Sequence, residues 1–294
     1  MLRIFMLWLL AGLPLHAWAL HVTATTASMG LLAREIGGET VRVTVLAPSD
    51  RDPHALQARP SMMRALRDAD LVVAVGAELE AGWMPAAIGN AGNPNILPGR
   101  IGYFEAAAQV PLLEAGQPAD RARGDVHPMG NPHIHLDPQR MIRVAHALAE
   151  RLARMRPNQG EAFRARAEGF ERTVSARMPH WRARAEHSPG AVLHHKDGLY
   201  LMTWLGRPVL GYLEPVPGVP PTAAHLERLA STLQGHHGVV LRAPYQPARS
   251  AEFLARRLGW EVRVVPMEPP SAGRVTDYLG LIDAWVDALA SAGR

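Results

Sequence analysis

The feature that most restricts the fold is a helical pattern of about thirty residues in the middle of the chain, at positions 158–187. Apolar or alanine positions recur there at three- and four-residue spacing, which is typical of a helix with one buried face. At 1.5 Å per residue such a helix would span about 45 Å, the length of a whole lobe. Pro179 lies inside the pattern and is expected to kink or shorten the helix, because proline removes a backbone hydrogen bond. The pattern predicts a spine that joins two halves of the chain.

Both halves alternate between strand and helix patterns. The predicted strands are residues 21–25, 41–46, 71–75, 190–196, 209–213, 238–241 and 261–265. The predicted helices are residues 28–37, 61–68, 138–155, 199–205, 222–233, 247–258 and 277–291. The run Leu71-Val-Val-Ala-Val75 is apolar throughout, as in a strand buried on both faces of a parallel sheet. We therefore predict an α/β protein of two lobes, each a mostly parallel sheet flanked by helices.

The first residues have the pattern of a secretory signal peptide. Arg3 precedes an apolar centre that is short for a membrane span and is interrupted by Pro14 and His16, and Ala17-Trp18-Ala19 supplies a cleavage site. We predict a protein of an extracytoplasmic space, the bacterial periplasm. The expected divisions are a signal peptide at 1–19, an N-terminal lobe at 20–156, a linking helix at 157–187 and a C-terminal lobe at 188–294.

Composition excludes two kinds of site. The 31 basic and 27 acidic residues leave a net charge of +4, which falls to +3 without Arg3, and no basic block stands out. We therefore expect no nucleic-acid partner. The chain has no cysteine, so it forms no disulfide and offers no thiolate. Any metal must be held by nitrogen and oxygen.

Three histidines fall within nine residues just ahead of the predicted helix at 138–155, in the stretch His127-Pro-Met-Gly-Asn-Pro-His-Ile-His-Leu-Asp-Pro138. Pro132 and Pro138 favour an extended segment in which His133 and His135 share one face. Imidazole is the commonest ligand for borderline metals, but this stretch alone fits a histidine-rich surface loop equally well.

Further histidines follow predicted strands elsewhere. His54 lies in a turn-rich loop beyond the strand at 41–46, and His194 and His195 end the strand at 190–196. Open α/β sheets bind ligands at the carboxyl ends of their strands. His54, His133 and His195 are therefore candidates for a common site.

Four stretches, in this order, resemble the zinc/manganese substrate-binding proteins of ABC metal importers, a periplasmic solute-binding family. They are Asp52-Pro53-His54, Gly130-Asn-Pro-His-Ile-His-Leu-Asp-Pro138, His195-Lys-Asp-Gly-Leu-Tyr200 with Trp204-Leu-Gly206, and Glu214-Pro-Val-Pro-Gly-Val-Pro-Pro-Thr-Ala-Ala-His225. Each stretch is weak alone, but together they cover essentially the whole mature chain. The resemblance implies two α/β lobes joined by one rigid helix, with the metal in the cleft between them.

The resemblance also implies a ligand set. His54, His133 and His195 match the metal-binding histidines of the family. For the fourth ligand, Glu268 is the only carboxylate at roughly the family's place before the last helix, and it is either a ligand or a loop carboxylate.

Three other histidines compete with these ligands. His135 stands where the family usually has an aromatic residue, which favours packing or support. His194 is expected to face away from its neighbour in an extended segment. His127 precedes the motif in a flexible loop, where transient metal binding is expected.

Three imidazoles with one carboxylate or water suit Zn²⁺, whereas a manganese site would carry more carboxylate. The resemblance implies a monomeric protein that is no enzyme and that delivers Zn²⁺ to an ABC permease and its ATPase, with a zinc metallochaperone as a further partner. A zinc hydrolase is the first alternative, although the sequence has no His-Glu-x-x-His or Gly-x-Ser-x-Gly motif. A zinc-buffering or adhesin surface protein is the second.

Overall fold

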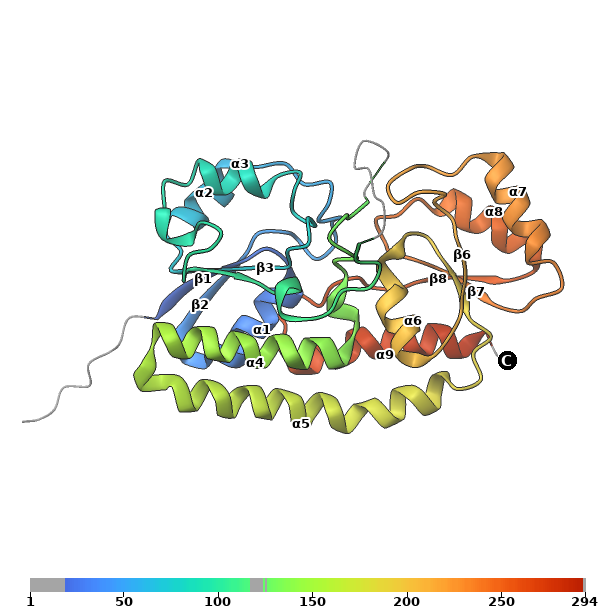
Figure 1. Ribbon diagram of the computed structural model, residues 1–294. Helices are drawn as coiled ribbons and strands as arrows, with labels where there is room; N and C mark the ends of the chain where they lie inside the picture. The colour runs from blue at the N-terminus through green and yellow to red at the C-terminus, as the bar shows by residue number, and fades with distance from the viewer. Residues whose placement is uncertain (1–18, 117–123, 125, 293–294) are drawn as a thin grey trace, which may run out of the picture.

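The computed structural model describes residues 19–116, 124 and 126–292. The predicted signal peptide therefore lies outside the described residues, apart from Ala19. Two lobes stand side by side above a base of long helices (Figure 1). Each lobe contains a four-stranded sheet in which every pairing is parallel. The predicted α/β architecture of two lobes is confirmed.

The two sheets have the same topology. In the N-terminal lobe the order is β2 (Val41–Val45), β1 (Leu20–Ala24), β3 (Leu71–Ala74) and β4 (Tyr103–Glu105). In the C-terminal lobe it is β6 (Val209–Tyr212), β5 (Ala191–Leu193), β7 (Val239–Arg242) and β8 (Glu261–Val264). Parallel strands present their carboxyl ends at one edge of the sheet, so the loops after them are the natural place for a ligand site.

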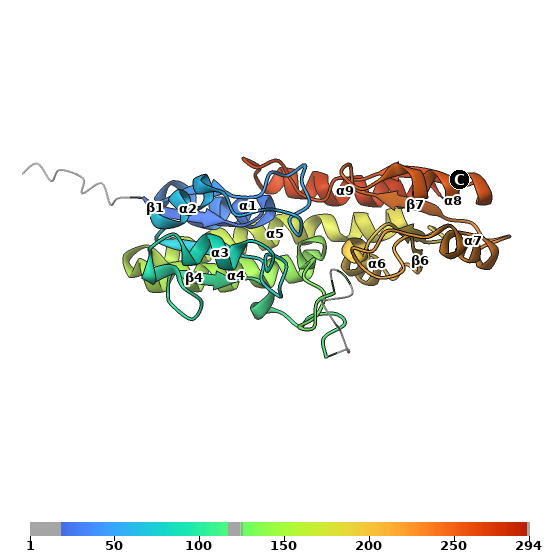
Figure 2. The same cartoon turned by 90° about the horizontal axis from the view of Figure 1, so that it is seen from above.

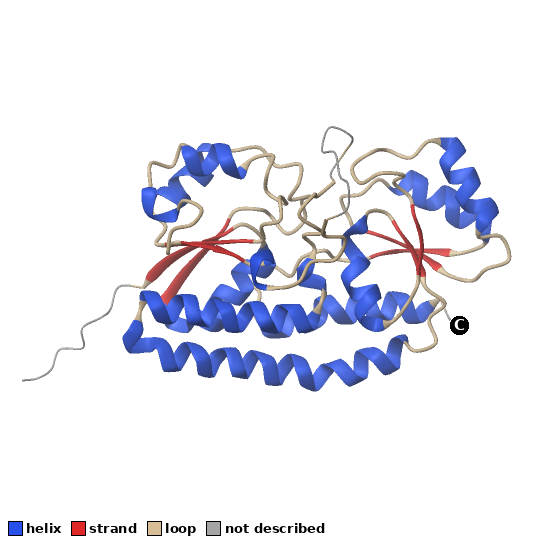
Figure 3. Cartoon of the chain, in the orientation of Figure 1, coloured by secondary structure: helices blue, strands red, loops and turns tan. Residues whose placement is uncertain are grey.

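Helices cover the sheets and form the base (Figure 3). The lobes carry α1 (Ala27–Gly37), α2 (Pro60–Arg67), α3 (Met84–Gly89), α6 (Leu199–Leu205), α7 (Ala223–Thr232) and α8 (Ala248–Leu258). The long helices are α4 (Pro138–Met155), α5 (Gly160–Ala185) and α9 (Val275–Ser291). Short 3-10 turns occur at Gly38–Thr40, Pro94–Ile96, Ala107–Gln109, Ile134–Leu136, Pro157–Gln159 and Lys196–Gly198. Within the described ranges, no helix is both long and apolar enough to cross a membrane.

Helix α5 is the predicted spine between the lobes. Its 26 residues extend for about 39 Å, and its buried side chains recur at helical spacing, among them Phe163, Phe170 and Trp181. Pro179 does not end the helix, which continues to Ala185. The helix continues past Pro179 because its apolar packing against α4 and α9 outweighs the loss of one backbone hydrogen bond.

One apolar core runs through both lobes. It includes side chains from β1, from α1, α4 and α5, and from β5 and α9, while a smaller cluster lies on the other face of each sheet. Helix α9 belongs to the end of the sequence, yet it reaches back to contact α1 of the N-terminal lobe (Figure 2). The base therefore fixes the two lobes against each other.

Candidate metal centre

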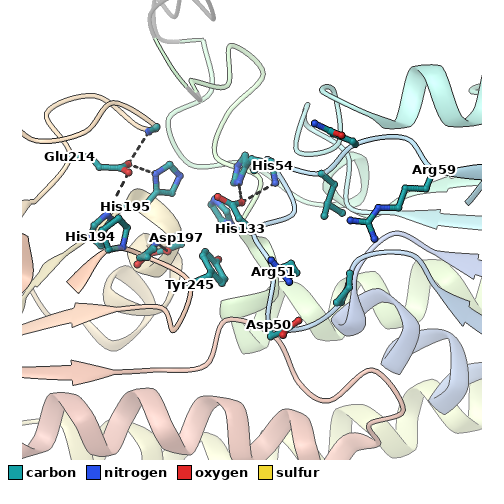
Figure 4. A pocket seen from close by; sticks show the side chains of 18 of the residues that line it. Asp50, Arg51, His54, Arg59, His133, His194, His195, Asp197, Glu214 and Tyr245 are labelled. Carbon is teal, nitrogen blue, oxygen red and sulfur yellow. Dashed lines mark hydrogen bonds and ion pairs between the residues drawn. The ribbon is translucent and has the colours of Figure 1, made fainter. Parts of the chain in front are cut away.

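Three histidines predicted as metal ligands converge between the lobes (Figure 4). His54, His133 and His195 each offer a ring nitrogen, and the three nitrogens all lie within 4.8 Å of one another. His54 comes from the loop after β2, His133 from the segment before α4 and His195 from the loop directly after β5. They line a cleft of about 680 Å³ whose walls come from both lobes.

Asp52 fixes the orientation of His54. Its Oδ1 accepts hydrogen bonds from the backbone N–H of His54 at 2.9 Å and from Nδ1 of the same ring at 2.8 Å. Burial opposes ionisation of Asp52, but the hydrogen bond and the attraction to His54 leave its pKa below the ordinary value. Because a carboxylate only accepts, Nδ1 of His54 carries the proton, and Nε2 keeps its lone pair, which accepts from Nε2 of His127.

His133 presents a ring nitrogen that lacks a partner. The side chain is 5% exposed, and its Nε2 is buried without a hydrogen bond. Asn131 holds the backbone in place, since its Oδ1 accepts from the His133 N–H at 2.9 Å. Burial, followed by repulsion from neighbouring histidines, lowers the pKa of His133 well below its ordinary value. A neutral imidazole with an orphaned buried nitrogen fits a metal ion.

His195 is held by Glu214. Its Nδ1 donates to Glu214 Oε2 at 2.7 Å. Burial opposes protonation of His195, but this bond and the charges of Asp197, Glu214 and Asp52 raise its pKa. Glu214 has its pKa lowered to about 2, because its contacts with the imidazoles of His194 and His195 outweigh burial. The sequence reasoning assigned no role to Glu214, although its position just after a predicted strand beside the His195 strand was a usable signal.

The predicted extended segment around His133 and His135 is wrong. Ile134–Leu136 forms a 3-10 turn, which places Ile134 and Leu136 in the core. Nε2 of His135 donates to the carbonyl oxygen of Met267 at 2.8 Å, and His135 is not among the three converging histidines.

Two other histidines lie close to the three. Nε2 of His127 is 3.2 Å from Nε2 of His54. With zinc–nitrogen bonds of 2.0–2.1 Å, two ligands of a tetrahedral zinc ion stand about 3.3 Å apart. Nε2 of His194, in contrast, lies 3.6 Å from Oε1 of Glu214, within the C-terminal lobe.

Glu268, like His127, lies outside the group of three ligand atoms that converge. Its Oε2 accepts from the backbone N–H of Ser28 at 2.6 Å and its Oε1 from the Ser28 hydroxyl at 3.1 Å. Ser28 belongs to the first turn of α1, where backbone N–H groups have no partner within the helix. Glu268 therefore caps a helix of the opposite lobe.

Comparison with known proteins gives one family for nearly the whole chain. The family model described as "Zinc-uptake complex component A periplasmic" matches residues 22–292. The high-affinity zinc uptake system protein ZnuA of Yersinia pestis is 26% identical over an alignment 288 residues long, and the match covers 92% of this chain and 89% of that protein.

Solved structures share the fold. A crystal structure of ZnuA is 20% identical with a TM-score of 0.77, and the match covers 94% of this chain and 100% of that one. The substrate-binding protein FpvC of Pseudomonas aeruginosa, solved in complex with Mn²⁺, is 21% identical with a TM-score of 0.78 over 93% of this chain and 98% of its own.

Proposed function

This chain belongs to the ZnuA family of periplasmic zinc-uptake components, and we propose that it captures Zn²⁺ and delivers it to the permease of an ABC importer. The observation that carries the proposal is the convergence of three histidine nitrogens in the cleft between the lobes. The rings of His54 and His195 each have Nδ1 hydrogen-bonded to a carboxylate, and His133 has a buried Nε2 without a hydrogen-bond partner. Each ring thus offers a lone pair to a cation.

His54, His133 and His195 are the proposed ligands. Their nitrogens lie within 4.8 Å of one another, whereas tetrahedral zinc requires about 3.3 Å, so each pair closes by at most about 1.5 Å on binding. Side-chain rotation and a small movement of the lobe loops are sufficient for this. Because the ligands come from both lobes, the ion joins the two walls of the cleft.

We assign the fourth position to His127. Its Nε2 already stands at 3.2 Å from Nε2 of His54, near the separation of two ligands on one zinc ion. Glu268 is the alternative fourth ligand that the sequence suggested. It would have to release Ser28 and leave the first turn of α1 without its cap, which disfavours it.

The chemistry of the donors favours zinc over manganese. An all-imidazole shell suits Zn²⁺, whereas Mn²⁺ prefers carboxylate and water oxygen. FpvC was solved with Mn²⁺ and with Ni²⁺, so the choice of ion within this fold has to be measured.

A protein that delivers zinc to an importer needs membrane partners and must act outside the cytoplasm. The matching family is a periplasmic component of a zinc-uptake complex, and we propose a permease and an ATPase as the partners of this chain. We propose that residues 1–19 direct export and are removed. The remaining chain then consists of an N-terminal lobe at 20–156, a linking helix at 157–187 and a C-terminal lobe at 188–294. It acts as a monomer, with a zinc metallochaperone as a further partner. Four protein ligands leave no water to activate on the ion, which suits transport rather than hydrolysis.

Zinc titration of matched histidine variants tests the proposal. Wild type should bind one zinc ion, and His54→Ala, His133→Ala and His195→Ala should each weaken binding by more than about a hundredfold, the upper end for losing mere support of a ligand. His180→Ala is the control, because His180 is exposed on α5. A competing titration with Mn²⁺ should leave zinc bound. Unchanged affinity in all three cleft variants would overturn the proposed function.

A further inference from the structure

Glu214 occupies a position that the two neighbouring parallel strands create. Strands β5 and β6 pair in parallel with Leu193 opposite Tyr212, so the residues that follow them emerge side by side. The backbone N–H of Glu214 donates to the carbonyl oxygen of His194 at 3.1 Å, which continues the pairing by one step. The carboxylate of one strand end therefore meets the imidazoles of the other.

The carboxylate is fully engaged by its own lobe. Oε2 accepts from Nδ1 of His195 at 2.7 Å and from the backbone N–H of Gly218 at 2.8 Å, while Oε1 lies 3.6 Å from Nε2 of His194. The Glu214 side chain is 15% exposed. Gly218 has a φ of +76°, a conformation that glycine adopts without strain, and this turns its N–H toward the carboxylate.

We propose that Glu214 is a positioning residue for zinc capture, which holds the ring of His195 with Nε2 facing the cleft and ties that ring to the proline-rich loop at 214–221. The inference rests on the proposed function, since it requires His195 to be a zinc ligand. A carboxylate accepts and does not donate, so its bond to Nδ1 selects the tautomer whose Nε2 lone pair is free. Its negative charge also makes the imidazole a stronger donor to a cation.

The contrast with Asp52 shows why Glu214 matters more. Asp52 holds His54 from two residues away along the chain, and its side chain is 37% exposed. Glu214 comes from a different strand, is more deeply buried, and binds a loop as well as a ring. Without Glu214, the ring of His195 is free to rotate or to carry its proton on Nε2. The ring of His54 is not affected by the loss of Glu214, because Asp52 still holds it.

The test combines zinc affinity with the tautomer of His195. Glu214→Gln should bind zinc about ten- to a hundredfold more weakly than wild type, the range for removing the partner of a metal-bound histidine. Glu252→Gln is the matched control, because Glu252 is exposed on α8 of the same lobe and lies outside the cleft. Long-range ¹H–¹⁵N NMR should show the His195 proton on Nδ1 in wild type, with zinc on Nε2 after loading. In metal-free Glu214→Gln, protonation on Nε2 should gain population.

The outcomes separate the two claims. A wild type that binds no zinc overturns the proposed function itself. A wild type that binds zinc, with equal affinity in Glu214→Gln, overturns only the role of Glu214. Weaker binding with an unchanged His195 tautomer also overturns it, because a merely structural effect would leave the tautomer as it is. If Glu214→Gln does not fold, the wild-type spectrum still decides, since zinc on Nδ1 of His195 contradicts the inference.

Discussion

Replacing Glu268 with alanine should destabilise the metal-free protein while leaving zinc binding largely intact. Glu268 accepts a short bond of 2.6 Å from the Ser28 N–H and a second of 3.1 Å from its hydroxyl, at the positive end of α1. Loss of a helix cap costs about 0.5–2 kcal/mol, and loss of a charge near a helix N-terminus a further 0.3–1 kcal/mol. The free energy of unfolding should therefore fall by about 1–3 kcal/mol.

Urea denaturation of the metal-free protein measures this change. The midpoint for Glu268→Ala should fall with an unchanged slope, since the surface exposed on unfolding stays the same. Ser28→Ala is the matched control. It removes only the hydroxyl partner and keeps the backbone donor, so its effect should be the smaller of the two. In the double variant the two effects should not add, because each change removes part of the same contact.

Zinc titration of the same variants then separates a cap from a ligand. A cap that lies outside the metal shell should change zinc affinity by less than about tenfold, the lower limit for supporting groups. Suppose instead that Glu268→Ala keeps the stability of wild type but loses zinc affinity by more than about a hundredfold. Glu268 would then be the fourth ligand, and the reasoning from its contact with Ser28 would be refuted.

Three further predictions concern the cleft and the core. His127→Ala should reduce zinc affinity by about tenfold or more with little change in stability, and unchanged affinity would return the fourth position to Glu268 or water. Because the pKa of His195 is raised, this ring of the metal-free protein begins to take up a proton at a pH above the ordinary pKa of about 6.5. The proton competes with zinc, so zinc affinity should decline with acidification. His133, with its lowered pKa, should add to this decline only at more acidic pH, and a flat profile between about pH 5 and 8 would contradict three histidine ligands. Glu80→Ala should lower the free energy of unfolding in urea by about 2–6 kcal/mol, because the buried Gly76 N–H and the buried Thr25 hydroxyl lose their acceptor, and wild-type stability would contradict this.

Regular elements with local signals were predictable from the sequence. Helix α4 begins and ends where its pattern predicted, because Asp137 caps it and Pro138 takes the first position. The four motifs predicted the family, and the match over residues 22–292 confirms it. The two-lobe α/β fold followed from alternating strand and helix patterns on both sides of the spine.

Features that depend on distant contacts were not predictable in the same way. Strand β4 has only three residues and forms through its pairing with β3. Three residues are too few to show the alternation of apolar and polar side chains that indicates a strand. The turn at Ile134–Leu136 lies between Asn131 and Asp137, the residues that Pro132 and Pro138 restrict, so the prolines did not decide its conformation; the turn buries two apolar side chains. The contact between Glu268 and Ser28 joins residues 240 positions apart, which no local pattern encodes.

X-ray absorption of the zinc-loaded protein tests the central claim most directly, because imidazole rings scatter in a way that allows them to be counted around the ion. We expect one zinc ion per chain with at least three imidazole nitrogens at about 2.0–2.1 Å, and a fourth if His127 binds. A shell with fewer than three imidazoles, or one made mainly of oxygen, would contradict a site built from His54, His133 and His195.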